Sequence, residues 1–286
     1  MKRYLLIGAG FSSNWGGWLA DEVFEHLIGQ AEIQADRDLL SLLWRCQTET
    51  GGGGFEGALA YLQRQQARRA LEDAGQMQRL EQAIELMFHD MNEGFRNRSF
   101  EFSQSISEQI SPVLARFDAI FSLNQDLLLE MKYVDADAAT LLGGRRWSGS
   151  ILPGIRRVRT SKDWLATREA PLGVPEENGW QIPKNAQPLI KLHGCASWRS
   201  GDDRRLLVLG GDKDGTIDRF PILKRYFEIF RAALSEPDAA LMVIGYGFRD
   251  RHVNQLLMEA AKSGLRLALV DPLGVNAVFG GQAGPK

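Results

Sequence analysis

The sequence contains little cysteine, and this scarcity removes two classes of protein from consideration. Its 286 residues include two cysteines, Cys46 and Cys195. Two lone thiols are too few for the disulfide framework of a small secreted domain, and too few for a four-cysteine zinc site. A disulfide-stabilised fold and a zinc module built from Cys-x-x-Cys pairs are therefore both excluded.

Long apolar runs and an excess of one charge are missing as well. No apolar stretch is long enough to span a bilayer, and the run at residues 4–7 is too short for the core of a signal peptide. Lysine and arginine total 34 against 36 aspartates and glutamates, which leaves a net charge of −2. This balance gives no electrostatic footprint for nucleic acid. We therefore expect a cytoplasmic protein that contacts neither membranes nor nucleic acid directly.

The first part of the chain combines an apolar run, a glycine turn and a helical pattern. Residues 4–7 are apolar without alternation, which is typical of a buried parallel strand. The glycines within residues 8–12 permit a tight turn and would leave backbone N–H groups facing a cavity. An amphipathic pattern over residues 19–27 then predicts a helix. Strand, glycine turn and helix start can together hold a diphosphate, although the full G-x-G-x-x-G is absent.

Residues 30–116 are predicted to form a helical insertion between the first two strands of the fold. Apolar residues recur there at helical spacing, for example Leu80, Ile84, Met87 and Phe88. The glycine run at 51–54 interrupts this pattern, because consecutive glycines do not hold a helix. We expect the insertion to serve oligomerisation or partner docking.

Five apolar runs each stop at a glycine or a polar residue. The runs cover residues 4–7, 117–123, 189–192, 240–244 and 265–270, and they stop at Gly8, Asn124, His193, Gly245 and Asp271. Helical patterns separate several of these runs, and this alternation predicts an α/β fold with a Rossmann-like parallel sheet. A further short strand is expected at 206–209, and loops with short strands at 131–187. In an open parallel sheet, ligands bind beyond the carboxyl ends of the strands, so the five stopping points should lie along one edge.

Three motifs occur in a fixed order along the chain. They are Gly8-Ala9-Gly10-Phe11-Ser12, Ser122-Leu123-Asn124-Gln125-Asp126 and Lys191-Leu192-His193-Gly194. This order resembles the SIR2-like (sirtuin-like) domain, whose members show Gly-Ala-Gly-x-Ser, Thr-x-Asn-x-Asp and His-Gly. The later stretch 243–254 is similar to a divergent bacterial branch that contains NAD-hydrolysing effectors of anti-phage defence. The resemblance implies one SIR2-like domain over residues 1–286.

The sequence departs from the sirtuin pattern at several points. Ser122 stands where the motif has threonine, which keeps a hydroxyl, and Gln125 stands where this branch often has an aromatic residue. Deacetylating sirtuins usually carry two Cys-x-x-Cys pairs, which this chain lacks. Their absence weakens the interpretation as a protein deacetylase and leaves the NAD site untouched.

The resemblance implies a site that cleaves the bond between nicotinamide and ribose in NAD, with no metal ion. Asn124, whose amide both donates and accepts hydrogen bonds, is expected to position ribose or water, and His193, which titrates near neutrality, to take up a proton. The residues expected to bind NAD are Gly8, Ala9, Gly10, Phe11 and Ser12 at the diphosphate, Asp126 and Gly194 beside the catalytic pair, and Gly245, Tyr246 and Asp271 along the adenosine half.

Each assignment has a structural alternative. A single histidine after a strand is more often structural than catalytic, and only the ordered motifs favour chemistry for His193. Asn124 and Asp126 also suit an ordinary turn. His252 and Asn254 lie at an expected helix start, where Asp250 suits an N-cap, so we expect no direct role for them.

Three functions follow from the resemblance. The leading one is an NAD glycohydrolase of anti-phage defence that acts by abortive infection through NAD depletion. Its activity would be released by homo-oligomerisation or by a partner such as a short Argonaute, a HerA-like ATPase or a nucleotide-sensing enzyme. The others are an NAD-dependent protein deacylase and a non-catalytic subunit that binds NAD or ADP-ribose.

Overall fold

The apolar run near the N-terminus forms strand β1 (Arg3–Ile7), which lies in the middle of a six-stranded parallel sheet. The strand order is β10-β9-β1-β2-β6-β3. The other strands are β2 (Ala119–Ser122), β3 (Gly149–Ile151), β6 (Ala186–Lys191), β9 (Ala240–Ile244) and β10 (Arg266–Val270). The predicted α/β fold with a Rossmann-like parallel sheet is confirmed.

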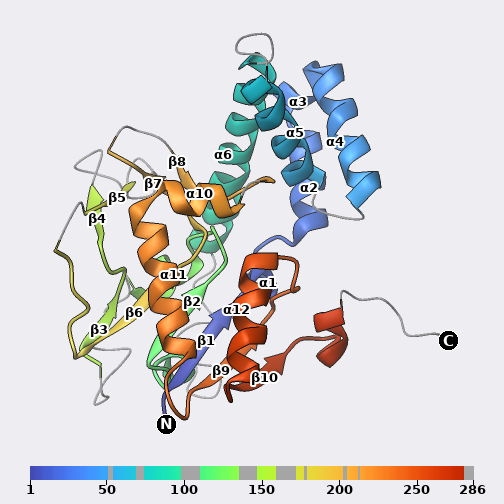
Figure 1. Ribbon diagram of the computed structural model, residues 1–286. Helices are drawn as coiled ribbons and strands as arrows, with labels where there is room; N and C mark the ends of the chain where they lie inside the picture. Colours follow the sequence, from blue (N-terminus) through green and yellow to red (C-terminus); the bar gives the residue numbers. More distant parts are fainter. Residues whose placement is uncertain are drawn as a thin grey trace.

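The computed structural model describes most of the chain, shown as a ribbon in Figure 1. The described residues are 1–50, 54–68, 74–97, 110–134, 147–158, 172–176, 179–201, 205–211 and 213–279. The glycines at 51–53 and much of the region expected to form loops with short strands at 131–187 lie outside these ranges.

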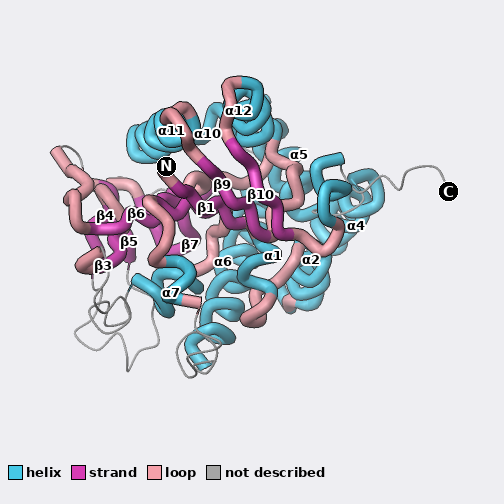
Figure 2. Tube along the Cα trace, turned by 90° about the horizontal axis from the view of Figure 1, so that it is seen from below, coloured by secondary structure: helices cyan, strands magenta, loops and turns pink. Residues whose placement is uncertain are grey.

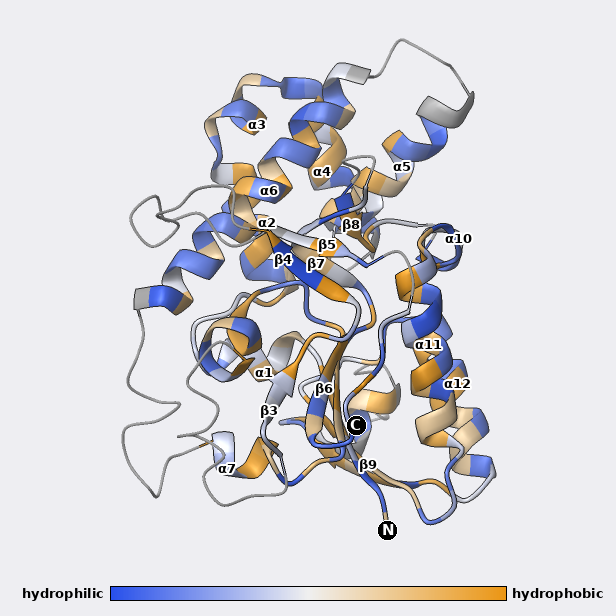
Figure 3. Cartoon of the chain, turned by 90° about the vertical axis from the view of Figure 1, so that its left-hand side faces the viewer, coloured by the Kyte–Doolittle hydropathy of each residue, from blue (hydrophilic) through white to orange (hydrophobic). Residues whose placement is uncertain are grey.

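Helices cover both faces of the parallel sheet, as Figure 2 shows. Successive side chains of a strand point to opposite faces. Leu5 and Ile7 of β1 accordingly pack into one apolar cluster, and Tyr4 and Leu6 into another. Both clusters are buried between the strands and the helical layers, and Figure 3 shows the central strands as largely hydrophobic.

The two apolar clusters contain residues from different helices. The cluster around Leu5 includes residues of α2 (Ala20–Gly29), α4 (Arg37–Thr50), α5 (Gly54–Arg68), α6 (Ala74–Asn97) and α7 (Ser111–Leu114). The cluster around Leu6 includes residues of α10 (Lys213–Arg219), α11 (Pro221–Leu234) and α12 (Arg251–Lys262). The remaining helical elements are α1 (Ala9–Ser13), α3 (Ala31–Ala35), the π-helix η1 (Glu130–Val134) and the 3-10 helix η2 (Gly274–Phe279). Within the described ranges, none of the helices has the length and apolar character that crossing a membrane requires.

The helices α3–α6 lie within the predicted insertion, and they stand beyond the carboxyl ends of the sheet strands (Figure 1). The expected glycine break falls between α4 and α5, and α5 begins at Gly54. The helix predicted over residues 19–27, before the insertion, is α2 (Ala20–Gly29). Near the end of the insertion, the described residues from 110 onward include the short helix α7.

A second, smaller sheet packs beside the first. It contains β4 (Ile155–Val158), β5 (Leu172–Pro175), β7 (Gly194–Arg199) and β8 (Arg205–Leu207), in the order β4-β5-β7-β8. The strand expected at 206–209 belongs to this sheet rather than to the parallel one. Gly194 has a positive φ of 71°, which turns the chain out of β6 and into β7. Short strands were expected within residues 131–187, but the sequence did not place β3 in the parallel sheet, because its three residues, Gly-Ser-Ile, form no apolar run.

Two glycine turns meet where β1 and β9 end. Gly8 N–H donates to the carbonyl of Ile244 at 3.0 Å, and Gly10 N–H donates to the carbonyl of Gly245 at 2.9 Å. Gly245 has a φ of 62°, and a Cβ placed on it would lie 2.3 Å from the nitrogen of Phe11. These contacts leave no room for a side chain at Gly245.

We therefore predict that Gly245→Ala lowers the free energy of unfolding by about 2–4 kcal/mol, because it combines an unfavourable φ with a backbone clash. Gly247→Ala is the matched control, since no atom lies within 4 Å of a Cβ there. Chemical denaturation of both variants measures the difference. Equal stability of the two variants would contradict this account of the turn.

Candidate active site at the carboxyl edge of the sheet

The segment from Gly8 to Ser12 begins a short helix immediately after β1, instead of forming an open loop. Helix α1 starts at Ala9, and Gly8 occupies its N-cap position in an extended conformation. The sequence led us to expect free N–H groups along this turn, but those of Gly8 and Gly10 already donate to carbonyls at the end of β9. Close packing of two backbones therefore accounts for these glycines, and their role at a diphosphate stays a prediction.

Asn124 links the ends of β1 and β2. Its Nδ2 donates to the carbonyl of Gly8 at 3.0 Å and to Oγ of Ser12 at 2.9 Å, and the residue is buried. The Ser12 hydroxyl in turn hydrogen-bonds the carboxyl of Asp126. Among the described residues, no side chain or backbone group donates to Oδ1 of Asn124, so this oxygen can accept a hydrogen bond from a bound hydroxyl group. Such an oxygen fits the ribose-positioning role expected for this residue.

Asp126 and the end of β6 share a buried charged cluster. Lys191 Nζ lies 2.6 Å from Oε1 of Glu130, and it also donates to the backbone carbonyl of Asp126. Burial raises the pKa of the Asp126 carboxyl, although the Lys191 ammonium opposes this shift. The cluster anchors the segment after β2, which carries Asn124, to strand β6. The backbone carbonyl of Asp126 takes part in this anchor, and the expected role of its side chain in binding NAD stays a prediction.

The backbone brings His193 next to the Asn124 segment. Leu123 N–H donates to the backbone carbonyl of Ile7 at 3.0 Å, and Leu192 N–H donates to that of Ser122 at 2.9 Å. The pairing of the strands therefore continues past their ends. His193 is 2% exposed, and its Nε2 lies 2.9 Å from Nε2 of His252. The His252 ring also packs against Phe227 of α11. Two imidazoles therefore lie together at this edge, where the sequence predicted one.

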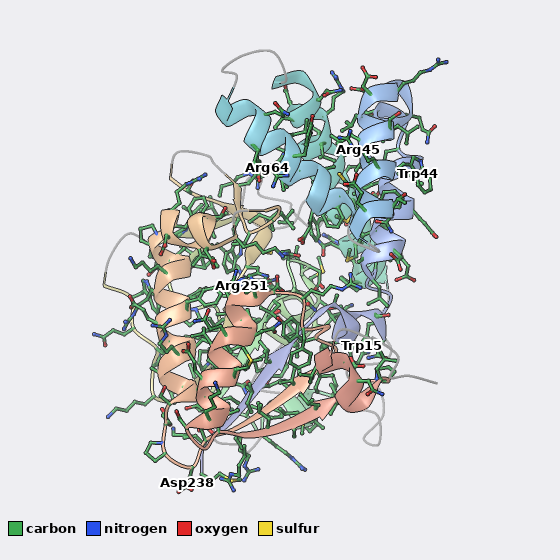
Figure 4. The ribbon with its side chains drawn as sticks, turned by 45° about the vertical axis from the view of Figure 1, so that its right-hand side comes forward. Trp15, Trp44, Arg45, Arg64, Asp238 and Arg251 are labelled. Carbon is green, nitrogen blue, oxygen red and sulfur yellow. The ribbon has the colours of Figure 1, made fainter. Side chains whose placement is uncertain are left out.

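A chain of charges leads from the two imidazoles to the helical insertion. Lys213 Nζ contacts Oδ1 of Asp250 at 2.7 Å and Oε2 of Glu56 at 3.0 Å. Asp250 precedes α12, and Glu56 lies in α5 of the insertion. Figure 4 shows the start of α12, marked by Arg251, on the side that faces the helix bearing Arg64. The insertion is thus in direct contact with the group of residues around His193.

Burial keeps both imidazoles neutral. Desolvation lowers the pKa of His193 to about 3, and the nearby Lys213 acts in the same direction while Asp250 opposes it. Desolvation likewise lowers the pKa of His252, against the attraction of Asp250 and Asp214. Partial burial would raise the pKa of the Asp250 carboxyl, but the charge of His193 when that ring is protonated and the ammonium of Lys213 outweigh burial and lower it. A neutral imidazole has a lone pair that can accept a hydrogen bond or a proton, and the carboxylate of Asp250 favours its protonated form against burial.

His193, His252 and Asp250 also form a set of donors that could hold a metal ion. One ligand atom from each lies within 4.8 Å of the others. The Lys213 ammonium already neutralises Asp250, however, and a cation bound there would have to share that carboxylate with it.

The other predicted site residues fall into different surroundings. Gly194 lies so close to the second sheet that a Cβ on it would meet the carbonyl of Leu206 at 2.1 Å. Tyr246 is buried, and its hydroxyl donates to Asn254 Oδ1 at 2.9 Å. Asp271 follows the edge strand β10, which β9 separates from β1, so it lies about 10 Å along the edge from Gly8. The binding roles of these three residues stay predictions.

Sequence reasoning missed the surroundings of His193. Asp250 occupies the N-cap position of α12 as expected, but its side chain makes no capping hydrogen bond and instead binds Lys213. No pattern in the sequence indicated that Lys213 belongs to the site, since it follows two glycines and lies far from every motif. The spacing Asp250-x-His252 after the strand at 240–244 was the available signal, because it placed two ionisable groups at a strand end.

Comparison with known proteins identifies the family of this chain. The sequence model of the SIR2-like domain family matches residues 118–269, which is more than half of the chain. The protein therefore belongs to the SIR2-like domain family, which includes NAD-dependent enzymes. A comparison with curated proteins found no match. The matched region contains Asn124, His193 and His252, whereas the glycine turn and the helical insertion precede it.

The depressed pKa of His193 makes stability depend on pH. The unfolded chain takes up this proton near pH 6.5 and the folded protein only near pH 3, so stability is lost as the pH falls between these values. We predict a loss of up to about 1.4 kcal/mol per pH unit from this group. His193→Gln should flatten the dependence of unfolding free energy on pH between 6.5 and 4, whereas the exposed His89→Gln should not. An unchanged slope in His193→Gln would disprove the assignment.

Proposed function

We propose that this protein is an NAD glycohydrolase that releases nicotinamide and ADP-ribose. The observation that carries the proposal is the position of Asn124. Its amide is fixed between Gly8 and Ser12 while its oxygen stays available, at the same sheet edge as His193. A member of the SIR2-like family that places an amide and an imidazole at one edge of its sheet has the groups needed to hold a ribose and to remove a proton.

The reaction needs few protein groups. The pyridinium loses its charge as the bond to ribose breaks, so the leaving group requires no acid. The ribose passes through an oxocarbenium-like state, and the protein must place a water molecule at the anomeric carbon and take its proton. Asn124 Oδ1 can orient the ribose or the water, and a neutral imidazole of the pair can receive the proton. This division of labour requires no metal ion.

Protein deacylation is the second candidate and has less support. Deacetylating sirtuins usually carry two Cys-x-x-Cys pairs, and the chain's two cysteines are Cys46 in α4 and Cys195 in β7. A deacylase would consume NAD only with an acyl-lysine peptide present. A non-catalytic subunit would bind NAD without turnover, but such a subunit would have no need for a neutral imidazole pair at the same sheet edge as Asn124.

An NAD glycohydrolase without control would be toxic, and we propose that assembly controls it. The leading biological role is an effector of bacterial anti-phage defence. A homo-oligomer or a partner such as a short Argonaute, a HerA-like ATPase or a nucleotide-sensing enzyme would release the activity. Support comes from the contact of Glu56, in the helical insertion, with Lys213 and through it with Asp250. A partner that moved α5 would act on the surroundings of His193.

The first test is nicotinamide release by the wild type and by Asn124→Ala, with NAD and with NADP. We predict a loss of at least about 100-fold in the variant, because the reacting groups lose their positioning. Asn276→Ala, which changes an exposed asparagine, is the control and should retain the wild-type rate. Tight NAD binding without turnover in every condition would favour the binding subunit, and turnover only with an acyl-lysine peptide would favour the deacylase.

The second test concerns control. We predict that the purified chain alone hydrolyses NAD slowly, and that its genomic neighbours or its own assembly into oligomers raise the rate. Rates measured across protein concentrations, with and without each neighbour, separate these two routes. A full rate from the isolated monomer would rule out control by assembly.

A further inference from the structure

Two imidazoles and a carboxylate converge at the carboxyl edge of the sheet. Nε2 of His193 lies 2.9 Å from Nε2 of His252. One ligand atom from each ring and one carboxylate oxygen of Asp250 all lie within 4.8 Å of one another. Two imidazole nitrogens and one carboxylate oxygen form a donor set that zinc takes in sites with three protein ligands, where a fourth position stays open. The chemistry of the three donors therefore fits a single metal ion.

The spacing of the two rings is close to what one ion requires. Nitrogens bound to the same zinc ion at 2.0–2.1 Å in tetrahedral geometry are about 3.3 Å apart. The Nε2 atoms of His193 and His252 lie 2.9 Å apart, so the rings need to separate by only about 0.4 Å to admit the ion. An ion would bind the lone pairs of both rings at once, whereas the contact between the rings joins them through a single hydrogen.

The three donors are held in place by the fold. Val208 N–H donates to the carbonyl of His193 at 2.9 Å, which fixes the backbone at the end of β6. Asp250 N–H donates to the hydroxyl of Tyr246 at 3.2 Å, and His252 lies in the first turn of α12. Preorganised ligands bind an ion without ordering a loop, and this preorganisation favours binding.

Lys213 leaves part of the Asp250 carboxylate available. Its Nζ contacts Oδ1 of Asp250 at 2.7 Å, and none of the described residues hydrogen-bonds to Oδ2. A carboxylate can give one oxygen to an ammonium and the other to a metal ion. Lys213 also contacts Glu56 at 3.0 Å, so its charge stays paired when Asp250 is shared.

The site is open on the side of α12. The side chains of His252 and Asp250 are 12% and 14% exposed, whereas His193 is 2% exposed and lies at the bottom. Asp214 places a further carboxylate oxygen 3.9 Å from Nδ1 of His252, and its side chain is largely exposed. A cation can therefore enter past an acidic side chain and reach the buried ring last.

We propose that His193, His252 and Asp250 bind a divalent transition-metal ion, with zinc as the best match, and that the bound ion inhibits the protein. Mixed imidazole and carboxylate donors suit zinc, whereas magnesium and calcium prefer oxygen alone. The inhibition rests on the proposed glycohydrolase function. Coordination occupies the lone pairs of both Nε2 atoms, so neither can take up the proton of the attacking water. The ion takes no part in the reaction.

Calorimetric titration with zinc tests the site without any enzyme activity. The chain has four histidines, so the double variant His26→Gln/His89→Gln leaves only the proposed pair. We expect this variant to bind one zinc ion per chain, and its affinity to fall at least about 10-fold when His252→Gln or Asp250→Asn is added. No binding by the double variant, or equal binding after both additions, would overturn the site.

Nitrogen NMR of the histidine-labelled double variant gives the same answer without a change in the site itself. Its two remaining rings are those of His193 and His252, and we expect zinc to shift the Nε2 signals of both. Unshifted signals under zinc would overturn the proposal, even where an added substitution prevents folding. Thermal unfolding without metal shows whether each added variant is folded.

Nicotinamide release with and without zinc tests the inhibition. We predict that saturating zinc lowers the rate of the double variant at least about 10-fold and that a chelator restores it. Equal rates with and without bound zinc would refute the inhibition. Zinc binding at these residues in a protein that cleaves no NAD under any condition would instead refute the proposed function and leave the metal site in place.

Discussion

The site depends first on the contact between the turns after β1 and β9. Gly8 and Gly10 donate their N–H groups to Ile244 and Gly245, and Gly245 approaches Phe11 so closely that no side chain fits. This contact fixes the start of α1, which carries Ser12, and the path of the chain from β9 toward α12, which carries His252. A shift of either turn would move both halves of the site together.

Strand register then determines which side chains meet. The parallel pairs place the ends of β9, β1, β2 and β6 side by side, so that residues more than two hundred positions apart share one edge. Asn124 joins the first two segments through the Gly8 carbonyl and the Ser12 hydroxyl. Buried polar groups are costly unless they are hydrogen-bonded, and each of these groups finds its partner only when the strands are in register.

Electrostatics connect this edge to the helical insertion. His193 and His252 are kept neutral by burial, Asp250 is kept ionised by Lys213, and Lys213 is shared with Glu56 of α5. An ion pair of this kind is sensitive to the loss of either partner, because the remaining, partly buried charge is left uncompensated. The insertion is therefore more than a separate helical unit beside the sheet, since one of its carboxylates helps to set the charge around the imidazoles.

The sequence by itself determined the fold class, the main strands of the parallel sheet and the gathering of Asn124 and His193 at one edge. These features follow from local patterns, because apolar runs that end in glycine or polar residues mark buried parallel strands and their carboxyl ends. The sequence did not determine that the N–H groups of Gly8 and Gly10 would be used by β9, that Asp250 would bind Lys213 instead of capping α12, or that His252 would face His193. Those contacts join segments that are distant in the chain, and only the packing of α12, α10 and α5 against the sheet edge decides them.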